Sequence, residues 1–280
     1  MNHRSIFRGI PAAFVVAVFT YSAAQAQLPA LNDAPWLGHF VGFEGKRFHF
    51  GVTSMGKITL NPLNDRDSPI GHKLTVNLEI GILETAPDGK QTLRKIKPET
   101  LTSSEPATDD LEKVVIRGKV SGDASFEATI ERQRDVILFG GRVLDAGTLK
   151  NPLNFGVNVK IPSAYPYDKA SDKKEDKSFQ KKIEDDLLQI KWTDGKRMRQ
   201  SFEEEVDAGS KELNGPGIAA AEIEISSYKG KKFLFTANEN SAMTISNGKP
   251  GPLHLGFELK WQPDPEKDKE GKSRLSLEVK

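Results

Sequence analysis

The 280-residue sequence contains no cysteine. This absence excludes disulfide bonds, thiolate metal sites, a cysteine nucleophile and a lipidated N-terminal cysteine. Histidine is scarce, with five residues, and no two histidines stand two or four positions apart as in common metal-binding motifs. A Gly-x-Ser-x-Gly nucleophile elbow is missing as well. The sequence therefore predicts no catalytic residue.

A strong excess of either charge is also missing. The formal net charge is +1, and it becomes −1 when the two arginines of the first ten residues, Arg4 and Arg8, are removed. A chain this close to neutral lacks the basic patch typical of proteins that bind nucleic acid or anionic membranes. Long hydrophobic runs are absent too, because the apolar stretch at residues 11–19 is far shorter than the roughly 20 residues that span a bilayer.

That short apolar stretch is typical of a secretory signal. Arg4 and Arg8 precede it, and Ala24 and Ala26 follow it as an A-x-A cleavage site before Gln27. We therefore expect residues 1–26 to be a signal peptide and the mature chain to be secreted or periplasmic.

Alternation of apolar and polar residues dominates the rest of the chain. Period-two alternation over seven or more residues indicates half-buried strands of an antiparallel sheet. The clearest cases are "KLTVNLEI" at 73–80, "FGVNVKI" at 155–161 and "LHLGFELKW" at 253–261, with further runs starting at residues 114, 125, 135, 220 and 274. The expected fold is all-β, with antiparallel sandwich-like or barrel-like units.

A short motif, Asn-Pro-Leu-Asn, occurs at 61–64 and again at 151–154. Each copy follows an apolar-x-Phe segment, which contains Phe50 or Phe139, and precedes an alternating segment. A related pattern surrounds Phe235 near the C-terminus. This recurrence predicts a β-unit that is used three times, with the motif as a turn rather than an active site.

Two charged stretches interrupt the strands. The segment 163–186 is predicted to be an insertion with a short helix, because Phe179, Ile183 and Leu187 recur every four residues. It would separate an N-terminal β domain of two repeat units, 27–162, from a C-terminal β domain with the third unit, 187–280. The alternative is one continuous β-sandwich in which this segment and residues 97–110 are long surface loops.

Four aromatic residues are the candidate ligand-binding residues. Tyr165 and Tyr167 lie in the "AYPY" sequence of the insertion, outside any predicted strand. Trp192 and Trp261 stand at equivalent places in "QIKW" and "ELKW", in phase with apolar neighbours. The phase favours core positions for both tryptophans, and an open strand face would make them stacking platforms instead.

Calcium is the one cofactor that the sequence suggests. Asp264, Glu266, Asp268 and Glu270 alternate with other residues before Gly271, and calcium prefers several carboxylate oxygens on one short loop. The spacing departs from an EF-hand loop, and interleaved lysines oppose a dication. A charged hairpin tip without any metal is therefore the favoured alternative.

These features together favour a non-catalytic binding or scaffolding protein at the cell envelope or outside the cell. Its partner would be a glycan, a protein or a lipid, without nucleic acid and without a membrane span. Two alternatives are a polysaccharide or ester hydrolase with a site assembled from loops, and a carrier that holds an apolar ligand between curved sheets.

Overall fold

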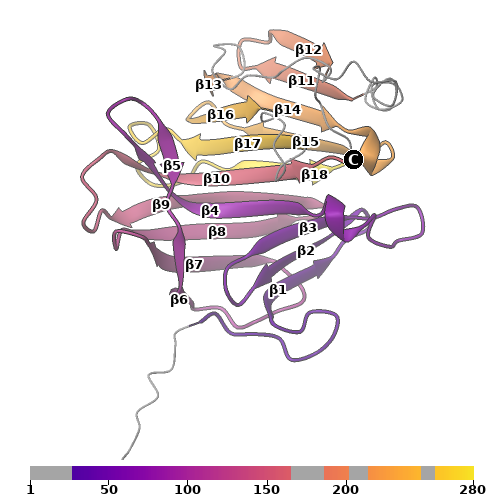
Figure 1. Ribbon diagram of the computed structural model, residues 1–280, viewed down its shortest axis with the longest axis horizontal. Coiled ribbons are helices and arrows are strands. Elements are labelled where there is room, and N and C mark those ends of the chain that lie inside the picture. The colour runs from indigo at the N-terminus through magenta and orange to yellow at the C-terminus, as the bar shows by residue number, and fades with distance from the viewer. Residues whose placement is uncertain (1–26, 165–185, 202–213, 247–255) are drawn as a thin grey trace, which may run out of the picture.

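Two large antiparallel β-sheets make up the computed structural model, which describes residues 27–164, 186–201, 214–246 and 256–280 (Figure 1). The predicted all-β sandwich is confirmed. Within the described residues, no helix has the length and apolar character needed to cross a membrane. The expected signal peptide, 1–26, and nearly all of the expected helical insertion lie outside the described residues.

The first sheet, which we call sheet I, contains nine strands. Its order is β1-β2-β3-β4-β10-β17-β16-β13, with β5 pairing on one side of β4. The strands are β1 (His39–Glu44), β2 (Phe48–Thr53), β3 (Ile58–Pro62), β4 (Val76–Thr85), β5 (Gln91–Leu93), β10 (Leu153–Pro162), β13 (Asn214–Pro216), β16 (Ser241–Ser246) and β17 (Gly256–Pro263).

Sheet II also has nine strands, in the order β12-β11-β14-β15-β18-β9-β8-β7-β6. They are β6 (Ile96–Ser103), β7 (Lys113–Val120), β8 (Ser125–Gln133), β9 (Val136–Asp145), β11 (Leu187–Trp192), β12 (Arg197–Ser201), β14 (Ile218–Glu224), β15 (Lys232–Ala237) and β18 (Leu275–Val279). Two short 3-10 helices, η1 (His72–Leu74) and η2 (Ser226–Tyr228), lie in connecting segments.

The core fills the space between the two sheets. The apolar phase of each alternating strand is buried, and these side chains form one continuous cluster. Aromatic rings join the sheets: Phe50 of sheet I lies 6.1 Å from Phe139 of sheet II, and Phe155 lies 6.5 Å from Phe126 between ring centroids. Because the apolar side chains of each strand point into the core, the alternate, polar side chains point to the outer faces of the two sheets.

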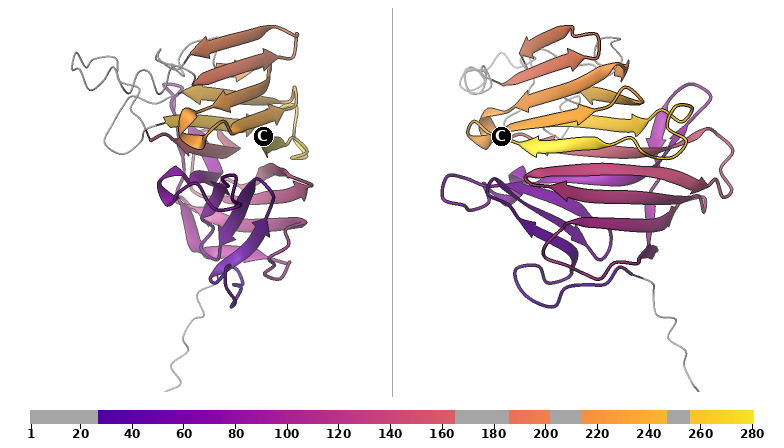
Figure 2. Two further views of the ribbon diagram at one scale, coloured as in Figure 1. Left: turned by 90° about the vertical axis from the view of Figure 1, so that its right-hand side faces the viewer. Right: turned by 180° about the vertical axis from the view of Figure 1, so that it is seen from behind.

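Both halves of the chain build both sheets. The segment 27–162 supplies β1 to β10, and the segment 187–280 supplies β11 to β18. The halves meet where β10 pairs with β17 in sheet I and β9 pairs with β18 in sheet II. The orange and yellow C-terminal strands therefore continue the sheets of the indigo to magenta N-terminal strands (Figure 2), and the two predicted domains share one core.

The three segments of the predicted repeat occupy different places in the fold. Phe50 lies on β2 in sheet I, whereas Phe139 and Phe235 lie on β9 and β15 in sheet II. The first Asn-Pro-Leu-Asn ends β3 and stays within sheet I. The second leads from β9 in sheet II to β10 in sheet I.

The prediction of a surface loop over residues 97–110 is wrong for residues 97–103, whereas residues 104–110 belong to none of the strands. Residues 96–103 form β6, which pairs with β7 at the edge of sheet II and buries Leu101. Pro98 is tolerated because an edge strand has unpaired positions. Farther along, Thr108 exchanges backbone hydrogen bonds with Phe40 and Gly42, and thus covers the edge strand β1.

Candidate functional site

Two rows of polar side chains cross the outer face of sheet I. The pairing register places them in line, because directly opposite residues point to the same face. One row is Thr59, Asn77, Lys160, Glu258 and Ser246 on β3, β4, β10, β17 and β16. The adjacent row is Glu79, Asn158, Lys260 and Thr244.

Asn158 is the centre of this group. Its Nδ2 donates to Oε1 of Glu258 at 2.8 Å and to Oε2 of Glu79 at 3.4 Å. The side chain therefore bridges two carboxylates on opposite sides of β10. Asn158 is only 6% exposed, and its Oδ1 is buried without a hydrogen-bond partner among the described atoms. A buried acceptor of this kind costs free energy until a donor reaches it.

Two lysines balance the charge of the two carboxylates. The Nζ of Lys160 lies 3.1 and 3.2 Å from the two oxygens of Glu79. Lys260 lies 3.6 Å from Oε2 of Glu258. The Glu79 side chain is 49% exposed and that of Glu258 is 24% exposed. Both carboxylates thus remain accessible from the solvent side of the sheet. We call these five residues, Glu79, Asn158, Lys160, Glu258 and Lys260, the sheet I cluster.

A pocket of about 500 Å³ opens beside this cluster. It lies along the edge of β4, where β3 stops pairing at Leu78 and β5 begins pairing at Leu83. Asn77 and Glu79 belong to its lining, so the cluster and the pocket are continuous. The other lining residues are Met55, Gly56, Lys57, Ile58, Leu78, Ile80, Leu93, Arg94, Lys95, Ile96 and Pro98.

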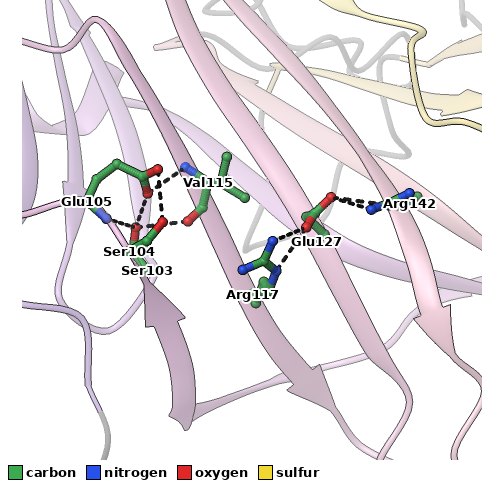
Figure 3. Close-up of polar contacts among 7 residues, drawn as sticks. All are labelled: Ser103, Ser104, Glu105, Val115, Arg117, Glu127 and Arg142. Carbon is green, nitrogen blue, oxygen red and sulfur yellow. Dashed lines mark hydrogen bonds and ion pairs between the residues drawn. The ribbon is translucent and has the colours of Figure 1, made fainter.

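A second polar group lies on the outer face of sheet II (Figure 3). Glu127 accepts hydrogen bonds from Arg117 at 2.6 and 2.9 Å, and from Arg142 at 3.1 Å. Burial by itself raises the pKa of Glu127, but the two guanidinium groups outweigh it and lower the pKa. A carboxylate held this firmly in its ionised form is a weak base, so the group is better suited to joining β7, β8 and β9.

Glu105, next to this group in Figure 3, is also fixed by hydrogen bonds. Its carboxylate accepts from the Ser103 hydroxyl at 2.6 Å, the Ser104 hydroxyl at 3.1 Å and the Val115 amide at 3.2 Å. Burial raises its pKa, and these hydrogen bonds together lower it by more. The carboxylate thereby anchors the end of β6 to β7.

The sequence-predicted aromatic residues are not brought together in the described structure. Tyr165 and Tyr167 lie outside the described residues. Trp192 is half-buried at the end of β11, with the Lys196 ammonium 5.2 Å from its ring centroid. Trp261 is fully buried in the core, and its ring meets that of Phe155 edge-on. Trp261 therefore occupies the core position that its phase favours.

The four predicted calcium ligands lie in the turn between β17 and β18. Asp264 accepts from the backbone amide of Glu266, and Asp268 accepts from the amides of Lys272 and Ser273. Glu270 forms an ion pair with Lys272. Across the described ranges, no three histidine or acidic side chains are grouped so that they could hold a metal ion. Calcium binding at this turn stays a prediction.

The sheet I cluster was missed by sequence reasoning. Glu79, Asn158 and Glu258 occupy the polar phase of strands that the alternation predicts correctly. In the sequence they resemble any solvated strand residue, since the register that aligns them depends on pairing between distant segments. The signal that could have found them is the polar row Asn-x-Glu on β4 and Asn-x-Lys on β10, in otherwise apolar strands.

No protein-family model matches the sequence, and no curated protein matches it significantly. A solved structure from Escherichia coli K12, named "Putative aldose 1-epimerase", is similar with a TM-score of 0.48 and 12% identity, over 86% of this chain and 98% of that one. The Slr1438 protein from Synechocystis sp. PCC 6803 has a TM-score of 0.44 and 10% identity, over 83% of this chain and 91% of that one.

The comparison corrects the expectation of a non-catalytic binding or scaffolding role. That prediction is not kept, because the structure found to be similar in fold is named a putative aldose 1-epimerase. The sequence contains no local catalytic motif, and a site assembled from distant strands would leave none. At these identities the similarity concerns the fold alone.

Proposed function

We propose that the protein is a carbohydrate-active enzyme whose substrate lies across the outer face of sheet I. The observation that carries this proposal is the pair of accessible carboxylates, Glu79 and Glu258, which the buried amide of Asn158 holds side by side on that face. A saccharide hydroxyl is both donor and acceptor. It can therefore donate to the carboxylate of Glu79 or Glu258, and accept from Lys160 or Lys260.

The same groups support proton transfer. A carboxylate within hydrogen-bond reach of a sugar hydroxyl can act as a general base, and a neighbouring ammonium can stabilise the charge that develops. Glu79 with Lys160 and Glu258 with Lys260 form two such pairs on either side of Asn158. The reaction class is acid–base conversion of a sugar, such as interconversion of anomers, with Glu79 and Glu258 in the acid and base roles.

Nuclear magnetic resonance exchange measurements on a panel of aldoses test this proposal. We expect the purified chain to accelerate exchange between anomers, and Glu79→Gln and Glu258→Gln each to lower the rate about 100-fold or more. Glu278→Gln, on the outer face of sheet II, is the matched control and should retain full activity. Absence of saccharide binding, or activity equal to that of the wild type in both glutamine variants, would overturn the proposal.

Export of the mature chain is proposed separately. The basic residues Arg4 and Arg8, the short apolar stretch and the Ala-x-Ala site before Gln27 support it. Intact mass measurement of the expressed protein provides the test, because cleavage should leave Gln27 as the first residue.

A further inference from the structure

We infer that the saccharide bound by this protein carries an anionic group, and that this group lies in the pocket beside Glu79. The inference rests on the proposed function, since it places the sugar ring on the sheet I cluster. The pocket shares Asn77 and Glu79 with that face. A substituent on a ring seated at Glu79 therefore enters the pocket directly.

The charges around the pocket are unequal. Lys57 and Lys95 line it from the β2–β3 turn and from the segment after β5, and both are exposed. Neither lysine forms an ion pair with any of the described residues. The remaining cation, Arg94, is paired with the buried carboxylate of Glu84. Glu79 is the single acid among the described lining residues, and Lys160 already pairs with it.

Two ammonium groups thus lack a counter-charge at a concave site. Lysines on a convex surface are fully solvated, whereas a pocket between low-dielectric walls concentrates their field and attracts an anion. The walls here are apolar, from Leu93, Ile96 and Pro98, and Met55 is exposed at 56%. An apolar wall with a few charged groups suits the carbon face of a sugar ring that bears one anionic substituent.

The chemical class is therefore an acidic saccharide, in which the anion is a carboxylate, as in a uronic acid, or a phosphate ester. Both offer oxygens that accept hydrogen bonds from lysine. A neutral aldose would leave the charge of Lys57 and Lys95 uncompensated in the complex.

Isothermal titration with three ligands provides the test: glucose, glucuronate and glucose 6-phosphate. We expect at least one of the two anionic ligands to bind about tenfold more tightly than glucose, and the preference to weaken in about 0.5 M salt. The double variant Lys57→Gln/Lys95→Gln should lose this preference and keep the affinity for glucose. Lys113→Gln, an exposed lysine on the outer face of sheet II, is the control and should change nothing.

The outcomes separate the inference from the proposed function. If the double variant keeps the preference, or the wild type binds all three ligands equally while Glu79→Gln abolishes activity, the inference fails and the proposed function stands. If none of the saccharides binds to the wild type and no aldose is converted, both fail. The glucuronate and phosphate arms distinguish the two sources of the anion.

Discussion

The hydroxyl of Tyr228 donates to the backbone carbonyl of Pro162 at 2.7 Å. This bond ties η2, which precedes β15 of sheet II, to the last residue of β10 in sheet I. The ring itself is fully buried and packs edge-on against Phe233, with 4.9 Å between the centroids. The side chain of Tyr228 therefore connects the two sheets at the C-terminal end of β10.

Replacement of this hydroxyl is the first prediction. Tyr228→Phe keeps the ring and leaves the Pro162 carbonyl without its donor, so we expect unfolding free energy to fall by about 1 kcal/mol. Burial raises the pKa of Tyr228, so the phenol ionises more readily in the unfolded chain. Its contribution is complete below the ordinary tyrosine pKa of about 10 and is lost above it. Urea titrations should show the difference between the two proteins shrinking above about pH 10; a constant difference would contradict this.

The second prediction concerns Glu127 and the two arginines that donate to it, Arg117 and Arg142, which we call the Glu127 clamp. Glu127→Gln leaves Arg117 and Arg142 without a counter-charge, and we expect a loss of about 1 kcal/mol or less, because both arginines are about half exposed. Since the pKa of Glu127 is lowered in the folded protein, its stabilisation is present above the ordinary glutamate pKa of about 4.3. It disappears as the pH falls through the lowered value.

Urea titrations at neutral and acidic pH check this dependence. Glu131→Gln is a suitable control on the same strand, since within the described structure its carboxylate accepts a side-chain bond from Gln133 and forms no ion pair. An equal stability gap between the wild type and Glu127→Gln at neutral pH and at about pH 3 would argue against the clamp.

The third prediction separates charge from shape at Asn158. Asn158→Asp adds a third carboxylate between Glu79 and Glu258 with almost no change in volume. We expect it to destabilise the fold at neutral pH by about 2 kcal/mol and to abolish saccharide binding, because like charges oppose one another on a partly buried face. Lowering the pH should restore part of the stability, since the introduced carboxyl group, once protonated, donates a hydrogen bond as the amide does.

Thermal unfolding between about pH 4 and pH 8, together with ligand titration, measures both effects. Asn240→Asp serves as the control, because its side chain makes no hydrogen bond within the described structure. Unchanged saccharide affinity in Asn158→Asp would remove Asn158 from the binding face.

Much of the fold could be predicted from the sequence, and the site could not. The alternation of Val157 and Val159 with Asn158 predicts both the strand and its polar phase, because burial of one face is a local property of a strand. The alignment of Asn158 with Lys260 depends on the pairing of β10 with β17. No local pattern encodes that register. In the sequence, Glu79, Asn158 and Glu258 therefore resemble ordinary solvated strand residues. The edge strand β6 was missed for a related reason, since Pro98 and its polar neighbours are typical of loops.

The junction of the two halves has a consequence for how the chain acquires its structure. The inner edges of β9 and β10 receive their partners from β18 and β17, which are among the last strands to be synthesised. Until residues 256–279 are available, two strand edges in the middle of the future sheets remain unpaired, and such edges readily recruit other chains. Truncation at the C-terminus should therefore cause aggregation rather than yield a shorter soluble protein. Folding should also be slow, because the pairs β9–β18 and β10–β17 join segments that are far apart in the sequence.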